Sequence, residues 1–191
     1  RPEWIDAALE HMQRSQAPLV ELLAAHGCRA CTDITGFGLL GHLGEMLGAS
    51  GPGLGSGAQG RQGFQKVDGG QAVSTEAACS WAAGDGGPIR PLAVKLDAAA
   101  IGALPGALEL LEQGWASSLA TANGRALRLL EGPIHLGASG CPTALQALLI
   151  DPQTCGPLLA ALPAERAGSA LAAVHRAGFD EAALIGRVLG A

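Results

Sequence analysis

The 191-residue sequence is poor in aromatic residues and in positive charge, and it has no long apolar run. Only 3% of its residues are aromatic and none is Tyr, although 48% are hydrophobic. The core must therefore consist of Ala, Leu, Val and Ile, which favours helices packed closely against a sheet. The length is that of one ordinary domain, so we expect a single domain over residues 1–191.

Positive charge is also scarce. Twelve Lys and Arg against 17 Asp and Glu leave a net charge of -5, and no run of four basic residues occurs. A nucleic-acid-binding surface is therefore not expected. No apolar run approaches the roughly 20 residues of a membrane-spanning helix, and the first residues lack the pattern of a secretion signal. We expect a cytoplasmic protein that binds neither nucleic acid nor membrane.

The five cysteines are odd in number and scattered along the chain, which argues against a disulfide framework. Cys28 and Cys31 form a CxxC pair, but no second CxxC or spaced His pair follows to complete a zinc site. We therefore interpret the cysteines as reduced thiols. Metal or redox chemistry at the CxxC pair is the minor alternative.

Hydrophobic periodicity predicts an α/β alternation of elements. The first half contains two helices, or one helix broken near Ser15, followed by a short strand, a glycine turn and a further helix. The second half begins with a strand and two helices and ends with strand, helix, strand. The expected helices cover residues 2–12, 17–27, 35–50, 104–114, 123–132 and 163–178, and the expected strands cover 28–34, 92–97, 156–163 and 182–190.

Residues 51–90 interrupt this alternation. They contain eleven glycines, few large aliphatic residues and no sustained periodicity. Such a composition does not offset the entropy lost on ordering, so we predict a disordered surface insertion within the domain.

The stretch TDITGFGLLGHL, residues 32–43, is the candidate site. Asp33 ends the predicted strand three residues before glycines that open a helix, where unpaired amides and the helix dipole attract phosphate. Gly36 and Gly38 would let the backbone approach a phosphate without a Cβ in the way. Because Mg²⁺ prefers carboxylate and phosphate oxygens together, Asp33 is a candidate ligand for a metal that also touches a nucleotide.

The residues of this stretch are compatible with two other interpretations. Asp33 as a helix cap is equally compatible with the residues, since Asp caps helices frequently. Gly36, Gly38 and Gly41 also spell the GxGxxG dinucleotide fingerprint, but no long aliphatic strand precedes them. No acidic residue ends a second strand about 20 residues later, so a Rossmann site is not expected.

Two long motifs give the sequence a family resemblance. TDITGFGLLGHL followed by GEM resembles the signature of the selenophosphate synthetases, and LLIDPQTCGPLLAALP resembles their DPQTSGGLL motif. The ending AALIGRVL is similar to their closing strand, and LPGALELLEQG and Asn123 fall in the family's order. Apart from the glycine-rich insertion, the resemblance extends over nearly the whole chain.

The resemblance implies an aminoimidazole ribonucleotide synthetase-like C-terminal domain of the α/β class, with a mixed sheet flanked by helices. The family makes selenophosphate from ATP, selenide and water and releases AMP and phosphate. In the matching motif the family's aspartate is a Mg²⁺ ligand, which transfers to Asp33, and we expect Thr35, Gly36 and Gly38 to contact the nucleotide.

The resemblance also implies an incomplete site. In the family, the reactive Cys or selenocysteine, a Lys and the other magnesium aspartates belong to an N-terminal domain that forms the dimer. Nothing similar to that domain is present, so we expect no catalytic residue in this fragment and no turnover without the missing domain. The alternatives are another ATP-dependent enzyme of the same superfamily and a non-catalytic remnant that binds a partner.

The second motif departs from the family pattern. Cys155 and Pro157 stand where the family has Ser and Gly, so a thiol replaces a hydroxyl and one flexible residue becomes rigid. We interpret Cys155 as a packed thiol and Asp151 as a turn residue. We expect His42 to be a packed histidine with one hydrogen bond, and His11, His26, His135 and His175 to lie on the surface.

Overall fold

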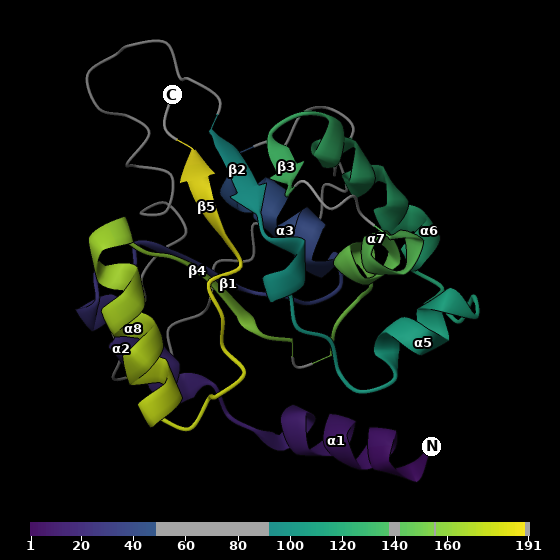
Figure 1. Ribbon diagram of the computed structural model, residues 1–191, viewed down its shortest axis with the longest axis horizontal. Coiled ribbons are helices and arrows are strands. Elements are labelled where there is room, and N and C mark those ends of the chain that lie inside the picture. Colours follow the sequence, from purple (N-terminus) through teal and green to yellow (C-terminus); the bar gives the residue numbers. More distant parts are fainter. Residues whose placement is uncertain (49–91, 138–141, 155, 190–191) are drawn as a thin grey trace, which may run out of the picture.

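The structure is a computed structural model that describes residues 1–48, 92–137, 142–154 and 156–189 (Figure 1). The glycine-rich insertion predicted at 51–90 lies outside the described residues, as do Cys79, Cys141 and Cys155. The predicted α/β class with a mixed sheet is confirmed.

Two helices open the chain, as predicted. α1 covers Pro2–Gln13 and α2 covers Ala17–Ala25, each with a proline in its first turn, where the missing N–H is not needed. The expected left-handed residue follows α2, since Gly27 has a φ of +81°. In Figure 1, α1 extends along one end of the molecule, whereas α2 lies beside the later helix α8 (Ala164–Arg176).

The short strand β1 (Ala30–Asp33) and the helix α3 (Gly38–Met46) confirm the predicted strand, turn and helix. β1 pairs antiparallel with β4 (Leu158–Ala161), which belongs to the second sequence motif. This pairing places the two motifs side by side, although some 120 residues separate them in the sequence.

A three-stranded sheet forms the other layer of the described part of the chain. Its central strand β2 (Ala93–Leu96) pairs parallel with β3 (Ile134–Leu136) and antiparallel with β5 (Gly186–Leu189). β2 and β5 confirm two predicted strands. The strand β3 was not predicted, because three residues are too few to show alternation.

Short helices connect these strands. They are η2 (Ala98–Ala100), α5 (Ala107–Glu112), α6 (Ala120–Asn123), η3 (Gly124–Glu131) and α7 (Thr143–Ile150). The prediction of an α-helix over 123–132 was wrong in type, because η3 is a 3₁₀-helix. Its buried residues Ala126 and Leu129 are three positions apart, and a 3₁₀-helix places such residues on one face. α7 was not predicted.

The helix α8 follows β4 closely, and Pro163 occupies its N-cap, one residue before the predicted position in the first turn. Pro163 has an extended backbone, which suits the residue that precedes a helix. α8 buries Ala170 and Val174, and Val174 packs with Leu19 and Leu23 of α2.

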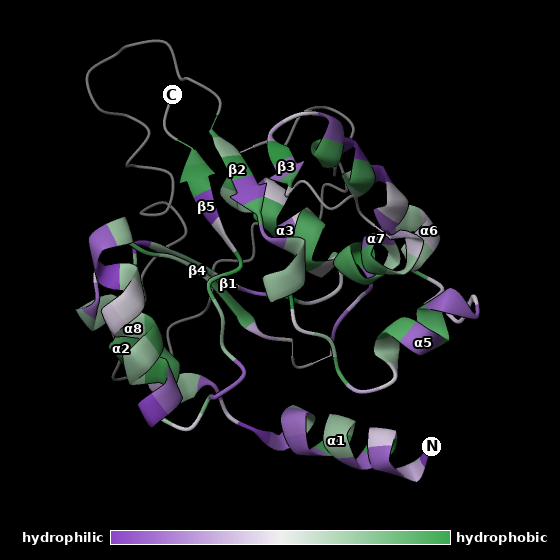
Figure 2. Cartoon of the chain, in the orientation of Figure 1, coloured by the Kyte–Doolittle hydropathy of each residue, from purple (hydrophilic) through white to green (hydrophobic). Residues whose placement is uncertain are grey.

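Two groups of buried apolar side chains hold the fold together. The larger lies between the three-stranded sheet and α3, η3 and α7, and its most buried members are Leu40, Leu96, Ile134 and Leu149. Figure 2 shows α3 and α7 as mostly hydrophobic elements in the middle of the molecule. The smaller group, Leu19, Leu23 and Val174, joins α2 to α8. Among the described residues, no helix has the length and apolar character needed to span a membrane.

Candidate functional site

Asp33 is the last residue of β1 and lies opposite Leu158 of β4. Its side chain is exposed, while the next residue, Ile34, is 3% exposed. The Ile34 amide donates a hydrogen bond of 2.9 Å to the Pro157 carbonyl, which extends the antiparallel pairing past the end of β1. The carboxylate is therefore presented to solvent from a backbone that is paired with β4 and with Pro157.

The turn after β1 is joined to the DPQT segment by backbone contacts. The Gln153 amide donates to the Thr35 carbonyl at 3.0 Å, and the Gln153 side chain donates to the Asp151 carbonyl at 3.2 Å. Gly156 lies so close to the Ile34 carbonyl that a Cβ at this position would collide with it. The two sequence motifs thus form one interlocked unit, which we call the motif junction (residues 33–38, 150–154 and 156–158).

Glycine at position 38 has a packing explanation. Gly38 has a φ of +67°, and a Cβ placed on it would lie 2.7 Å from the backbone carbon of Ile150. The start of α3 therefore packs against the end of α7. At Gly36, by contrast, a Cβ would meet no atom of the described residues within 4 Å. The nucleotide contacts expected of Thr35, Gly36 and Gly38 stay predictions.

Asn123 connects both halves of the motif junction. Its side-chain amide donates to the Gly36 carbonyl at 2.8 Å and to the Ile150 carbonyl at 2.9 Å. One side chain thus satisfies two backbone acceptors from segments that are far apart in the sequence. The family resemblance singled out Asn123 only by its order in the chain, and the structure supplies the physical reason.

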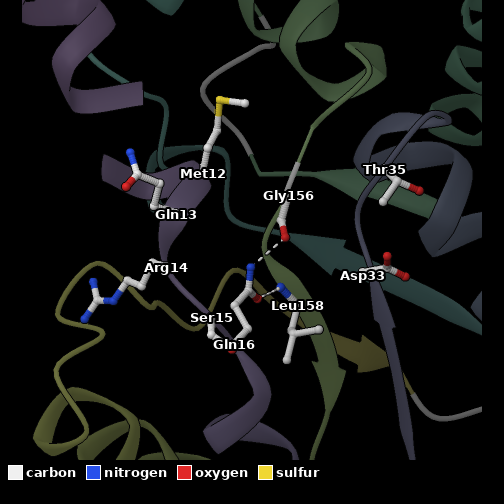
Figure 3. A pocket seen from close by; sticks show the side chains of 9 residues that line it. All are labelled: Met12, Gln13, Arg14, Ser15, Gln16, Asp33, Thr35, Gly156 and Leu158. Atoms are coloured by element: carbon white, nitrogen blue, oxygen red, sulfur yellow. Dashed lines mark hydrogen bonds between the residues drawn. The ribbon is translucent and has the colours of Figure 1, made fainter. Parts of the chain in front are cut away.

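An open pocket of about 520 Å³ lies over the motif junction. Asp33, Thr35, Gly156 and Leu158 line one side, and Met12 to Gln16, from the end of α1 and the link to α2, line the other. Figure 3 shows Asp33 and Thr35 next to each other, across Gly156 and Leu158 from Gln16. The pocket therefore contains both the predicted metal ligand and a predicted nucleotide-binding residue.

Gln16 fixes the second motif from the opposite side of the pocket. Its side-chain nitrogen donates to the Gly156 carbonyl at 2.7 Å, and its side-chain oxygen accepts from the Leu158 amide at 2.9 Å (Figure 3). The amide side chain thereby pairs with the backbone as a neighbouring strand would. Sequence reasoning missed Gln16, because a single Gln between two helices carries no recognisable pattern.

His42 differs from its predicted environment. It is 7% exposed, as expected for a packed histidine, but it makes two hydrogen bonds and not one. Its Nε2 lies 3.2 Å from Thr35 Oγ1, and its Nδ1 lies 3.0 Å from Glu45 Oε2. Glu45 was not predicted to take part in the site, although the spacing of His42 and Glu45 by three helical positions is a signal that they are neighbours.

The structure decides between the interpretations of the glycine turn. The N-cap of α3 is Phe37, and no side-chain capping bond is formed there among the described residues, so Asp33 does not cap this helix. β1 pairs with β4 in the antiparallel sense and has no parallel partner in the described part of the chain, unlike the first strand of a dinucleotide-binding fold. The Rossmann interpretation is therefore rejected on structural grounds.

Magnesium is compatible with part of this arrangement. Within the described ranges, no group of three or more His, Cys, Asp or Glu side chains could hold a metal ion. Mg²⁺, however, is commonly bound by one or two carboxylates together with water and the phosphates of a substrate. Asp33, exposed in the pocket, fits such a shared site, and further protein ligands would have to come from outside the described residues.

Two ionisable features lie near the junction. Burial raises the pKa of the Asp151 carboxyl above its ordinary value, and a hydrogen bond from the Ser117 backbone opposes this effect.

Cys28 and Cys31 are free thiols. A hydrogen bond from Cys31 lowers the pKa of Cys28 to about 7, and the same contact raises the pKa of Cys31. The altered residue Cys155 of the second motif lies outside the described residues.

Known proteins resemble the chain along almost its whole length. It is 31% identical over 189 residues to a selenide, water dikinase of Desulfitobacterium hafniense and 30% identical over 185 residues to one of Porphyromonas gingivalis. A selenide, water dikinase of Burkholderia orbicola is 35% identical over 172 residues. The chain is a relative of the selenide, water dikinases. The matches cover 97%, 96% and 90% of this chain.

A domain family described as "AIR synthase related protein, C-terminal domain" matches residues 5–56, which include most of α1 and all of α2, β1 and α3. This match and the mixed α/β architecture confirm the predicted relationship to the C-terminal domain of the selenide, water dikinases. The chain spans only 41%, 40% and 36% of the length of the three relatives.

Proposed function

We propose that this chain is the C-terminal part of a selenide, water dikinase. The complete enzyme would convert ATP, selenide and water into selenophosphate, AMP and phosphate, as the family resemblance implies. The observation that carries the proposal is the motif junction, because it brings the two sequence motifs shared with that family to one pocket beside the exposed carboxylate of Asp33. The names of the relatives support the same activity.

In this proposal Asp33 is one of several magnesium ligands. A bound Mg²⁺ would neutralise the charge of the transferring phosphoryl groups and orient them. The exposed side chain of Asp33 and its rigid backbone suit a ligand that must meet a phosphate from solvent. Thr35 and the open space beside Gly36 would accommodate the nucleotide next to that ion.

The remainder of the site would come from the domain that the relatives have beyond the matched region. A single carboxylate cannot hold the metal ions of a phosphate-rich transition state, so the chain by itself is expected to be inactive. We further propose a cytoplasmic homodimer of the complete protein. Other ATP-dependent enzymes of the same superfamily, and a non-catalytic remnant, are the competing functions.

The first test replaces Asp33 by Ala in the full-length protein. Loss of a metal ligand should lower selenide-dependent AMP formation on the order of 10²-fold while the melting temperature stays unchanged, since Asp33 makes no core contact. Glu131→Ala, which removes another exposed carboxylate, is the matched control and should retain wild-type activity. Wild-type AMP release by the Asp33 variant at saturating Mg²⁺ would remove this residue from the mechanism.

The products separate the competing functions. A selenide, water dikinase forms AMP only when selenide is present, and ³¹P NMR should show a phosphorus–selenium product. Another ATP-dependent enzyme of the superfamily would consume ATP without selenide. A protein that consumes no ATP under either condition would be a non-catalytic remnant.

A further inference from the structure

A hydroxyl, an imidazole and a carboxylate lie in a row beside the pocket. Thr35 Oγ1 lies 3.2 Å from His42 Nε2, and His42 Nδ1 lies 3.0 Å from Glu45 Oε2. Thr35 belongs to the turn after β1, whereas His42 and Glu45 are three positions apart on α3. The row thus begins at solvent, passes through the interior and ends at a residue that lines the pocket.

His42 is held in one orientation. The residue is 7% exposed, and its ring packs against Phe37 with the ring centroids 5.5 Å apart. The Glu45 side chain is 56% exposed, so its pairing with His42 adds little to the stability of the fold. The main effect of Glu45 is therefore to decide which ring nitrogen of His42 carries the proton.

The direction of the Thr35 hydroxyl follows from which ring nitrogen of His42 carries the proton. An ionised carboxylate only accepts hydrogen bonds, so the His42 nitrogen that faces Glu45, Nδ1, is the protonated one. In a neutral imidazole the other nitrogen, Nε2, is then an acceptor, and the Thr35 hydroxyl must donate to it. The lone pairs of Thr35 Oγ1 then remain free for a further partner.

We propose that His42 and Glu45 are positioning residues that make Thr35 an oxygen ligand, directly or through one water molecule, for the magnesium ion held by Asp33. This inference rests on the proposed function. Asp33 and Thr35 are two positions apart and lie next to each other on the same side of the pocket (Figure 3). A hydroxyl that donates its hydrogen bond to His42 cannot also donate it to a phosphate oxygen, but its oxygen matches the hard ligands that Mg²⁺ prefers.

The test compares metal binding with nucleotide binding in the full-length protein. Calorimetry gives the Mg²⁺ affinity with a nonhydrolysable ATP analogue bound, and separately the affinity for the analogue without metal. Thr35→Val keeps the side-chain shape but removes the oxygen, and it should weaken Mg²⁺ binding roughly tenfold, as loss of supporting ligands does. The affinity for the metal-free analogue should stay at the wild-type level.

Three further variants sharpen the test. Thr35→Ser restores the oxygen and should recover most of the Mg²⁺ affinity. Glu45→Gln should weaken Mg²⁺ binding in the same direction as Thr35→Val but by less, because it acts through His42. Glu131→Ala, an exposed carboxylate outside the row, is the matched control and should bind Mg²⁺ as the wild type does.

A second readout uses the wild-type protein and depends on no variant. ¹⁵N NMR of histidine-labelled protein, with His42 assigned by its absence from His42→Gln, should show a protonated Nδ1 and an unprotonated, hydrogen-bonded Nε2. A protonated Nε2 would overturn the proposal, because Thr35 would then accept from His42. So would a Thr35→Val protein that binds Mg²⁺ as tightly as the wild type, or one that loses affinity equally for the metal-free analogue.

Failure of this inference is distinguishable from failure of the proposed function. If Asp33→Ala weakens Mg²⁺ binding and Thr35→Val does not, only the role of Thr35, His42 and Glu45 is wrong. If wild-type protein binds no Mg²⁺ with the analogue, or if Asp33→Ala binds it as tightly as the wild type, the proposed metal site itself is wrong.

Discussion

The motif junction and α1 are neighbours on the same pocket but are built in opposite ways. In the motif junction, backbone groups from two distant segments bond to each other, and Ile34 beneath them is 3% exposed. α1 contains no buried residue, and Ile5, Leu9 and Met12 on it are 61%, 47% and 43% exposed.

This difference shows what constrains the residue types in the motif junction and on α1. In the motif junction, close backbone contact dictates glycine and hydrogen-bonding side chains, so the sequence there is constrained by the described fold itself. On α1, Trp4 packs against Gly106 before α5, but Ile5, Leu9 and Met12 remain largely exposed. Their contribution to the fold of this chain is therefore small.

The largest effect is expected from adding a methyl group inside the motif junction. Gly156→Ala would place a Cβ against the Ile34 carbonyl, and Gly38→Ala would add both a collision with Ile150 and a strained positive φ. Each should lower the free energy of unfolding by about 2–5 kcal/mol, measured by urea denaturation.

Gly168→Ala in α8 is the matched control, because its new Cβ meets no described atom within 4 Å. It should raise stability by roughly 0.5–1 kcal/mol, as alanine does in a helix. If the junction variants were as stable as this control, the tight interlocking of the two motifs would be wrong.

A smaller loss is expected from Asn123→Ala. The change leaves the Gly36 and Ile150 carbonyls without their donor, and such groups cost about 1–3 kcal/mol when unsatisfied. Calorimetric melting should show the loss. Thr121→Ala, at an exposed position of the same short helix, should leave the melting temperature unchanged, and an equal effect of the two variants would argue against the connecting role of Asn123.

A still smaller, pH-dependent effect is expected at Asp151. Because burial raises the pKa of this carboxyl in the folded chain, its ionised form disfavours folding at neutral pH. The stability due to this group increases as the pH falls through the folded-state pKa towards 3.8, its ordinary value.

Asp151→Asn removes this charge and keeps an oxygen that can accept from the Ser117 backbone. The variant should melt at a slightly higher temperature than the wild type at pH 7, and the gain should disappear below pH 3.8. Melting curves recorded from pH 7 to pH 3 measure the difference. A gain that is the same at every pH would exclude the charge of Asp151 as its cause.

The least effect is expected on α1. Ile5→Ser and Leu9→Ser should each change the stability of the 191-residue chain by no more than about 0.5 kcal/mol, because both side chains are already largely exposed. Leu40→Ala, at a position that is 0% exposed, should cost about 2–5 kcal/mol in the same urea denaturation experiment. A comparable loss of stability in the α1 variants would show that these side chains are packed and would contradict the contrast between α1 and the motif junction.

Long periodic segments were predicted well, and short or irregular ones were not. α1, α2, α3 and α8 follow from apolar spacing and from their prolines and glycines. β3 and α7 were missed, because three residues show no alternation and the short, mostly apolar α7 shows no clear periodicity. η3 was predicted as an α-helix, because apolar spacing of three or four residues does not separate the two helix types.

Within the site, the sequence predicted some of the residues but not the residues that they contact. Asp33 and Thr35 were singled out from the strand, turn and helix pattern, and the structure places both on one pocket. Gln16 and Glu45 were missed, because each acts on a residue brought near by folding or by the helix turn. Gly38 was predicted for an approach to phosphate, whereas the described contacts of its backbone are with α7.

The sequence by itself determined the α/β class, the family and the two motifs, because periodicity and motif order are properties of the linear chain. Only the tertiary structure decided that these motifs form one junction, that Asp33 faces a pocket and does not cap a helix, and that His42 bonds both Thr35 and Glu45. The junction depends on contacts between segments up to 142 residues apart, about which local spacing carries no information, whereas the bonds of His42 are local and depend on how the turn and the helix orient its ring.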